Sequence, residues 1–70
     1  MIEVTAPMTG SVFLVHVAPG DAVTADGDLI TLESMKMEIP VKAPVAGTVR
    51  EVRVQPADAV QDGDVLVVLE

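Results

Sequence analysis

The chain has 70 residues, no cysteine, a single aromatic residue, Phe13, and a formal net charge of −7. These features exclude disulfide or thiolate–zinc staples and argue against nucleic acid and anionic membrane surfaces as partners. No apolar run is long enough to span a membrane and no signal-peptide pattern is present, so we expect one cytoplasmic domain, residues 1–70.

From the N-terminus onward, short segments rich in valine and leucine alternate with turn residues, a pattern typical of an all-β domain. In chain order, strands are expected at Ser11–Val17, Leu29–Glu33, Thr48–Val54 and Val65–Leu69. His16 is the only histidine, so no His-based triad or zinc site can be assembled, and strand alternation should point it outward. No stretch shows sustained helical periodicity.

The second half of the chain repeats the first at an offset of 37 residues, without a gap. Residues 2–33 and 39–70 form the repeats, and residues 34–38 join them. One half cannot cover its own apolar face, so we expect two halves packed about a pseudo-two-fold axis as a small sandwich or flattened barrel. This symmetry places the joining hairpin at one end of the barrel and both chain ends together at the other. The matched positions include Ala6-Pro7 with Ala43-Pro44, Gly10 with Gly47, Asp21-Ala22-Val23 with Asp58-Ala59-Val60, and Glu33 with Glu70.

The turns of the two halves differ in sequence. Gly20 should supply a positive φ in the first half, whereas its counterpart is Ala57, which predicts either a different turn or mild strain. The loops Asp26-Gly27-Asp28 and Asp62-Gly63-Asp64 carry their glycines one position out of register, so we expect these loops to differ. Neither loop has the ligand series of a calcium site, and no metal is expected.

The joining segment has no counterpart in the repeat, so the fold does not explain it. Turns favour Gly, Asn, Asp and Pro, whereas this one holds Met35, Lys36 and Met37. From composition alone, two interpretations stay open: the methionines fold back on the core, or they are displayed for a partner. Lys42, the other lysine, matches Thr5 and is interpreted as a solvated surface charge.

The run Glu33-Ser34-Met35-Lys36-Met37-Glu38 resembles the attachment motif of biotin carrier domains. The resemblance extends over the whole chain, through Ala6–Gly10, Gly20–Val23 and Ala43–Val49. It implies the family fold, a flattened β-barrel (barrel-sandwich hybrid) of two four-stranded antiparallel sheets. It also implies that Lys36 carries covalent biotin, with Glu33, Ser34, Met35, Met37 and Glu38 as recognition flanks.

By this resemblance the chain is a non-catalytic, monomeric carrier. A biotin protein ligase would modify Lys36, and the biotin would shuttle carboxyl groups between a biotin carboxylase and a carboxyltransferase. An acyl-CoA carboxylase is the expected parent enzyme, or a related decarboxylase.

The alternative is a lipoyl domain of a 2-oxoacid dehydrogenase complex, in which Asp and Ala typically flank the lysine. Here Met35 and Met37 favour biotin. The barrel of a membrane-fusion protein is excluded, because only residues 34–38 separate the halves. An enzyme is disfavoured, because the sequence has no nucleophile–base pair, metal cluster or phosphate-binding loop.

Overall fold

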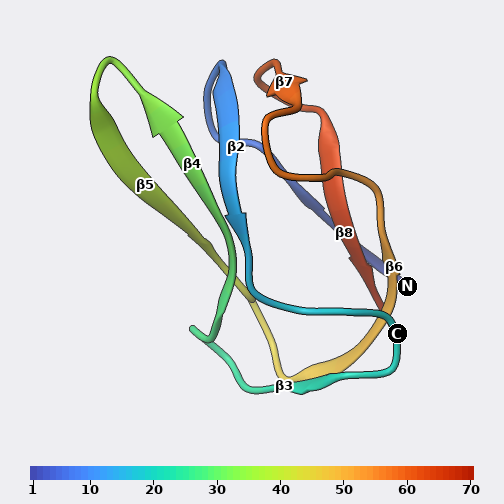
Figure 1. Ribbon diagram of the computed structural model, residues 1–70. Helices are drawn as coiled ribbons and strands as arrows, with labels where there is room; N and C mark the ends of the chain where they lie inside the picture. The colour runs from blue at the N-terminus through green and yellow to red at the C-terminus, as the bar shows by residue number, and fades with distance from the viewer.

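The structure, a computed structural model, describes all residues from 1 to 70 and consists of eight strands without a helix (Figure 1). The all-β prediction is therefore confirmed, and no helix capable of crossing a membrane is present. The strands are β1 Ile2–Thr5, β2 Gly10–Val15, β3 Ala22–Val23, β4 Asp28–Ser34, β5 Met37–Lys42, β6 Gly47–Val52, β7 Ala59–Val60 and β8 Val65–Leu69.

Three of the predicted strands have different bounds. β4, expected at Leu29–Glu33, is longer by one residue at each end. β2 and β6 begin one residue earlier than Ser11–Val17 and Thr48–Val54 and end two residues earlier. Beyond Val15 a single backbone bond continues the pairing with β4, from the His16 amide to the Leu29 carbonyl at 2.9 Å, so the ladder stops there. Val17 still packs against the core, which explains why its apolar character suggested a longer strand.

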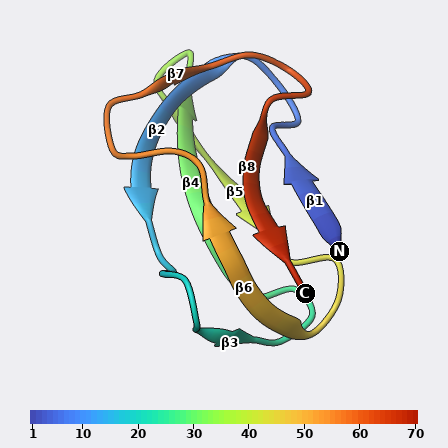
Figure 2. The same ribbon diagram turned by 90° about the vertical axis from the view of Figure 1, so that its right-hand side faces the viewer.

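The eight strands form two antiparallel four-stranded sheets, in the orders β1-β8-β6-β3 and β5-β4-β2-β7. The 37-residue offset converts one order into the other, strand by strand. Each sheet also takes strands from both halves, so neither half could form a sheet alone (Figure 2). The predicted fold class, with its internal pseudo-two-fold repeat, is confirmed.

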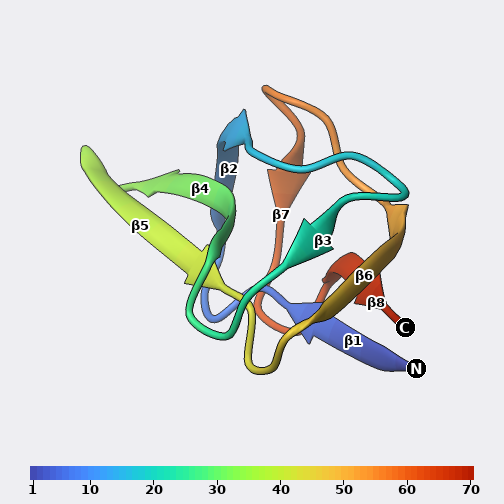
Figure 3. The same ribbon diagram turned by 90° about the horizontal axis from the view of Figure 1, so that it is seen from below.

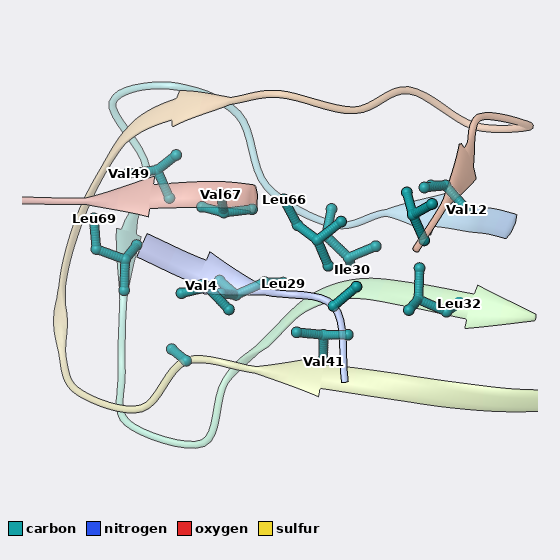
Figure 4. Close-up of a cluster of buried hydrophobic side chains, with 13 residues drawn as sticks. Val4, Val12, Leu29, Ile30, Leu32, Val41, Val49, Leu66, Val67 and Leu69 are labelled. Carbon is teal, nitrogen blue, oxygen red and sulfur yellow. The ribbon is translucent and has the colours of Figure 1, made fainter. Parts of the chain in front are cut away.

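The core lies between the two sheets and obeys the same symmetry (Figure 4). Burial of these aliphatic side chains, at about 25 cal/mol per Å² of apolar surface, is the main force holding the sheets together. All of the buried cluster except Val60 falls into pairs related by the repeat: Val4 with Val41, Ala6 with Ala43, Val12 with Val49, Leu29 with Leu66, Ile30 with Val67, and Leu32 with Leu69.

The Gly20 turn and its Ala57 counterpart have the same backbone conformation. Gly20 has φ 95° and Ala57 has φ 77°. The Gly20 amide donates to the Val49 carbonyl and the Ala57 amide donates to the Val12 carbonyl, both at 2.8 Å. Of the two expected outcomes, the structure shows the strained one, in which an alanine occupies a left-handed position.

The Asp-Gly-Asp loops share a backbone conformation but differ in one side-chain bond: the Gln61 amide donates to Asp64 Oδ2 at 2.8 Å, whereas Gly27, the counterpart of Asp64, has no side chain to accept such a bond. Asp26 occupies the left-handed position of Gly63, with φ 67° against 92°. Their amides donate to the carbonyls of Ala43 and Ala6, at 2.8 Å and 2.9 Å. The closing bond dictates the backbone, and aspartate tolerates the left-handed region better than most side chains, so the displaced glycine leaves the backbone of the loop unchanged.

Candidate functional site

The hairpin formed by β4 and β5 projects beyond the rest of the barrel (Figures 1 and 3). Both chain ends lie together on the opposite side of the molecule, as the repeat predicts. In the β1-β8-β6-β3 sheet, the position corresponding to the hairpin is occupied by the ends of β1 and β8, where Ile2 pairs with Leu69. The hairpin tip is thus the one part of the barrel that the repeat does not duplicate.

The turn of this hairpin contains two residues. Ser34 and Met37 form the last pair of the ladder, which leaves Met35 and Lys36 as the loop, with φ 53° and 66°. Two positive φ values in a two-residue hairpin define a type I′ turn, which Asn-Gly forms most readily. With side chains other than glycine, each left-handed position costs about 1–2 kcal/mol. The fold would be served better by other residues at this tip.

The side chains of the tip are displayed to solvent. Met35 is 91% exposed and Met37 is 63% exposed, so the methionines do not fold back on the core and that interpretation is wrong. Lys36 is also exposed, and its amine forms no ion pair or hydrogen bond with the protein. An amine held there is open to an electrophile carried by another protein.

The base of the hairpin is fixed against the loop between β1 and β2. The Ser34 hydroxyl donates to the Thr9 carbonyl at 3.1 Å. A Cβ on Gly10 would lie 2.8 Å from the Glu33 carbonyl oxygen, so only glycine permits this approach of β2 to β4. The same approach recurs between Gly47 and the Glu70 carbonyl oxygen, also at 2.8 Å.

Sequence reasoning missed this support of the site. The available signal was the recurrence of Gly10 as Gly47, which indicates a backbone approach required in both halves. Of the predicted flanks, Glu33 and Glu38 face each other across the ladder, one pair below Ser34 and Met37. All six residues from 33 to 38 therefore lie within the last two pairs and the turn.

Lys42 and His16, which the sequence indicated to be ordinary surface residues, lie away from the tip. Lys42 is exposed at the far end of β5, opposite Asp28. His16 is exposed and its Nε2 lies 2.7 Å from the Thr31 hydroxyl, in agreement with its predicted outward position.

A family model described as "Biotin-requiring enzyme" matches residues 2–69 of the chain. The biotin/lipoyl attachment protein of Bacillus subtilis is 44% identical over 68 residues, which cover 97% of this chain and 93% of that protein. Glutaconyl-CoA decarboxylase subunit gamma of Acidaminococcus fermentans is 50% identical over 37 residues, which cover 53% of this chain and 26% of the subunit.

Solved structures of larger enzymes and of an isolated domain have the same fold. The urea carboxylase of Kluyveromyces lactis matches with a TM-score of 0.93 at 30% identity, and a single-chain, multi-domain long-chain acyl-CoA carboxylase with 0.89 at 33%. These matches cover 99% and 94% of this chain but only 6% of each enzyme. The lipoyl domain of the 2-oxoglutarate dehydrogenase complex from Azotobacter vinelandii matches with a TM-score of 0.83 at 29% identity, covering 100% of this chain and 96% of the domain.

Proposed function

The chain belongs to the biotin/lipoyl attachment family of carrier domains, and we propose that it carries biotin on Lys36 in a biotin-dependent carboxylase. The observation that carries this proposal is the tip of the β4–β5 hairpin. There an unpaired, exposed lysine sits between two exposed methionines, in a turn whose geometry disfavours both of its residues, Met35 and Lys36.

The residues present fit a covalently attached group. Attachment needs an accessible primary amine, and Lys36 Nζ would form an amide with the carboxyl group of biotin. The rigid support at Gly10 and Ser34 holds the base of the arm while the lysine side chain extends from it. When bound, biotin accepts a carboxyl group at one enzyme site and gives it up at another. Tethering to a mobile domain raises its local concentration at both sites.

The methionines support biotin over lipoate. Met35 and Met37 offer flexible apolar surface that can repack against several partners in turn. The lipoyl alternative is kept because the Azotobacter lipoyl domain shares the fold across the whole chain. The proposed partners are a ligase, a biotin carboxylase and a carboxyltransferase. An acyl-CoA carboxylase is the proposed parent enzyme, because an acyl-CoA carboxylase and a glutaconyl-CoA decarboxylase subunit are among the similar proteins.

The test is labelling of the purified chain. We expect incubation with a biotin protein ligase, ATP and biotin to add one biotinyl group, located on Lys36 by peptide mapping. Lys36→Arg should abolish labelling and leave thermal unfolding unchanged, whereas Lys42→Arg, the matched control, should be labelled like the wild type. A lipoyl adduct from a lipoate ligase without a biotin adduct would assign the chain to the alternative, and labelling of Lys36→Arg would refute the site.

A further inference from the structure

The outer faces of the two sheets differ in chemistry, although their backbones are equivalent. The outer face of the β1-β8-β6-β3 sheet carries five charged side chains: Glu3, Arg50, Glu51, Arg53 and Glu70. Their counterparts around the β5-β4-β2-β7 sheet, in the same order, are Pro40, Phe13, Leu14, His16 and Glu33. Since the fold is satisfied by charged residues on one sheet, it does not require apolar residues on the other.

The exposed apolar pair lies at a β-bulge. In β2 the register shifts between Val12 and Leu14, and in β6 it shifts at the equivalent position, between Val49 and Glu51. The bulge places two consecutive residues on the solvent side between inward-facing valines. In β2 these residues are Phe13 and Leu14, which are 44% and 46% exposed.

On the β1-β8-β6-β3 sheet, the two arginines form ion pairs with neighbouring glutamates. Arg50 and Glu70 form an ion pair at 3.6 Å, and Arg53 pairs with Glu51. The hydrogen bond and charge of Glu51, followed by the charge of Glu3, raise the pKa of the Arg53 guanidinium.

The β5-β4-β2-β7 sheet, which bears the hairpin, has no such ion pairs. Glu33 is the counterpart of Glu70, but the position of Arg50 is held by Phe13. Glu33 instead faces Glu38 across the β4–β5 ladder, and neither carboxylate has a cationic partner. Like charges directly opposite each other destabilise a sheet, so this pair costs stability in the free domain. By equivalence with Arg50 and Glu70, Phe13 lies on the strand next to Glu33. The two unneutralised carboxylates and the exposed ring are therefore complementary to a cation delivered by another molecule.

This surface lies within reach of any enzyme that works on Lys36. Leu14 in β2 pairs with Thr31 in β4, and Thr31 pairs with Pro40 in β5, so these residues lie side by side on the sheet that carries the hairpin. From Thr31 to Met35 is about 13 Å along the strand, at ~3.3 Å per residue. The enzyme that attaches the prosthetic group must draw the unmodified lysine itself into its active site. The modifying ligase therefore approaches this face more closely than an enzyme that works on the far end of an already extended arm.

We propose that Phe13, Leu14, Glu33 and Glu38 form a docking face for the ligase that modifies Lys36. The ligase contributes an arginine or lysine, flanked by apolar side chains, that lies over Phe13 and neutralises Glu33 and Glu38. The cation takes the place that Arg50 occupies on the other sheet. This inference rests on the proposed function, because it assumes that Lys36 is modified by a ligase.

The equivalent bulges of β2 and β6 supply both the test variant and its matched control. Phe13→Arg with Leu14→Glu copies Arg50-Glu51 into β2, at a bulge whose twin in β6 already accommodates that pair. Arg50→Phe with Glu51→Leu makes the reverse change on the opposite sheet. Both variants should keep the cooperative thermal unfolding transition of the wild type, followed by far-UV circular dichroism.

The assay is the rate of Lys36 biotinylation by a purified biotin protein ligase with ATP and biotin, as a function of the concentration of the unmodified chain. For Phe13→Arg with Leu14→Glu, we expect KM for the chain to rise about tenfold or more with kcat nearly unchanged, because aromatic contacts dominate docking. Glu33→Gln with Glu38→Gln should raise KM at low salt and weaken its salt dependence. Arg50→Phe with Glu51→Leu should leave KM within about twofold of wild type, because an exposed ion pair contributes little.

The outcomes separate the two proposals. A wild-type chain that neither a biotin ligase nor a lipoate ligase labels overturns the proposed function, and the docking face with it. A wild-type chain that is labelled, with equal KM for the β2 and β6 double variants, overturns the docking face alone. A fall in kcat without a change in KM would also overturn it, because that result would mean a disturbed hairpin rather than a lost contact.

Discussion

The turns at Gly20 and Ala57 are equivalent in the repeat, so the stability effect of a substitution in one can be compared with that in the other. The two residues hold the same left-handed conformation and make equivalent 2.8 Å backbone bonds, yet only one of them is glycine. A Cβ added to Gly20 would meet no atom within 4 Å, so replacing it changes the backbone preference without a clash. The difference between the turns is therefore the left-handed penalty of alanine.

The magnitude follows from two opposing terms. Relief of the left-handed conformation at Ala57 should contribute about 1–2 kcal/mol. The greater freedom of glycine in the unfolded chain should cost about 0.4–1 kcal/mol. Ala57→Gly is thus expected to raise the free energy of unfolding by about 0.5–1 kcal/mol, or Tm by about 2–8 °C for a domain of this size. Gly20→Ala should lower stability by a similar amount.

The measurement is thermal and urea unfolding by far-UV circular dichroism, since the chain has no tryptophan or tyrosine to serve as a fluorescent probe. The double exchange, Gly20→Ala with Ala57→Gly, is the strictest test. One turn bonds to β6 and the other to β2, in different sheets, so the effects should add and nearly cancel. A destabilised Ala57→Gly protein, or a Gly20→Ala protein with unchanged stability, would refute the reasoning.

Two further substitutions test the support of the hairpin and the core. Gly10→Ala places a Cβ 2.8 Å from the Glu33 carbonyl oxygen and should destabilise the domain by about 1–3 kcal/mol and slow labelling of the hairpin. Gly47→Ala, with the same 2.8 Å approach to the Glu70 carbonyl oxygen, should destabilise without slowing labelling, and equal labelling rates would contradict a special role for Gly10. Leu66→Ala, at a fully buried position, should cost about 2–5 kcal/mol. Such a loss is a large part of the ~3.5–10 kcal/mol expected for a domain of this length, so a well-folded variant in urea titration would be unexpected.

The gapless repeat made the architecture predictable from sequence. β8 is found at Val65–Leu69 as predicted, because its apolar run is bounded by turn residues on one side and Glu70 on the other. The strand bounds of β2 and β6 were not predictable, because their valines continue into segments that pack on the core without pairing. The bulges also escaped prediction, since they depend on register across strands that are distant in sequence.

The turns show a different limit of sequence reasoning. The displaced glycine at Gly27 suggested a changed loop, but the closing hydrogen bond to Ala43 dictates the conformation and Asp26 accepts it. At the candidate site, the segment without a repeat counterpart could be found from sequence alone. The sequence could not decide whether Met35 and Met37 pack inward, because that depends on the two-residue turn and the length of the β4–β5 ladder.

The repeat therefore separates what the fold needs from what it only tolerates, provided that backbone conformation is compared together with residue type. Asp26 and Gly63 differ in sequence but serve the same backbone, so that difference carries no functional meaning. The hairpin tip differs from these loops. Met35 and Lys36 occupy two adjacent left-handed positions, which lowers the free energy of unfolding by about 2–4 kcal/mol in total. Asn-Gly would occupy the same positions at little cost. In a domain of marginal stability, exposed side chains that oppose their own backbone are best explained by what they present to other molecules.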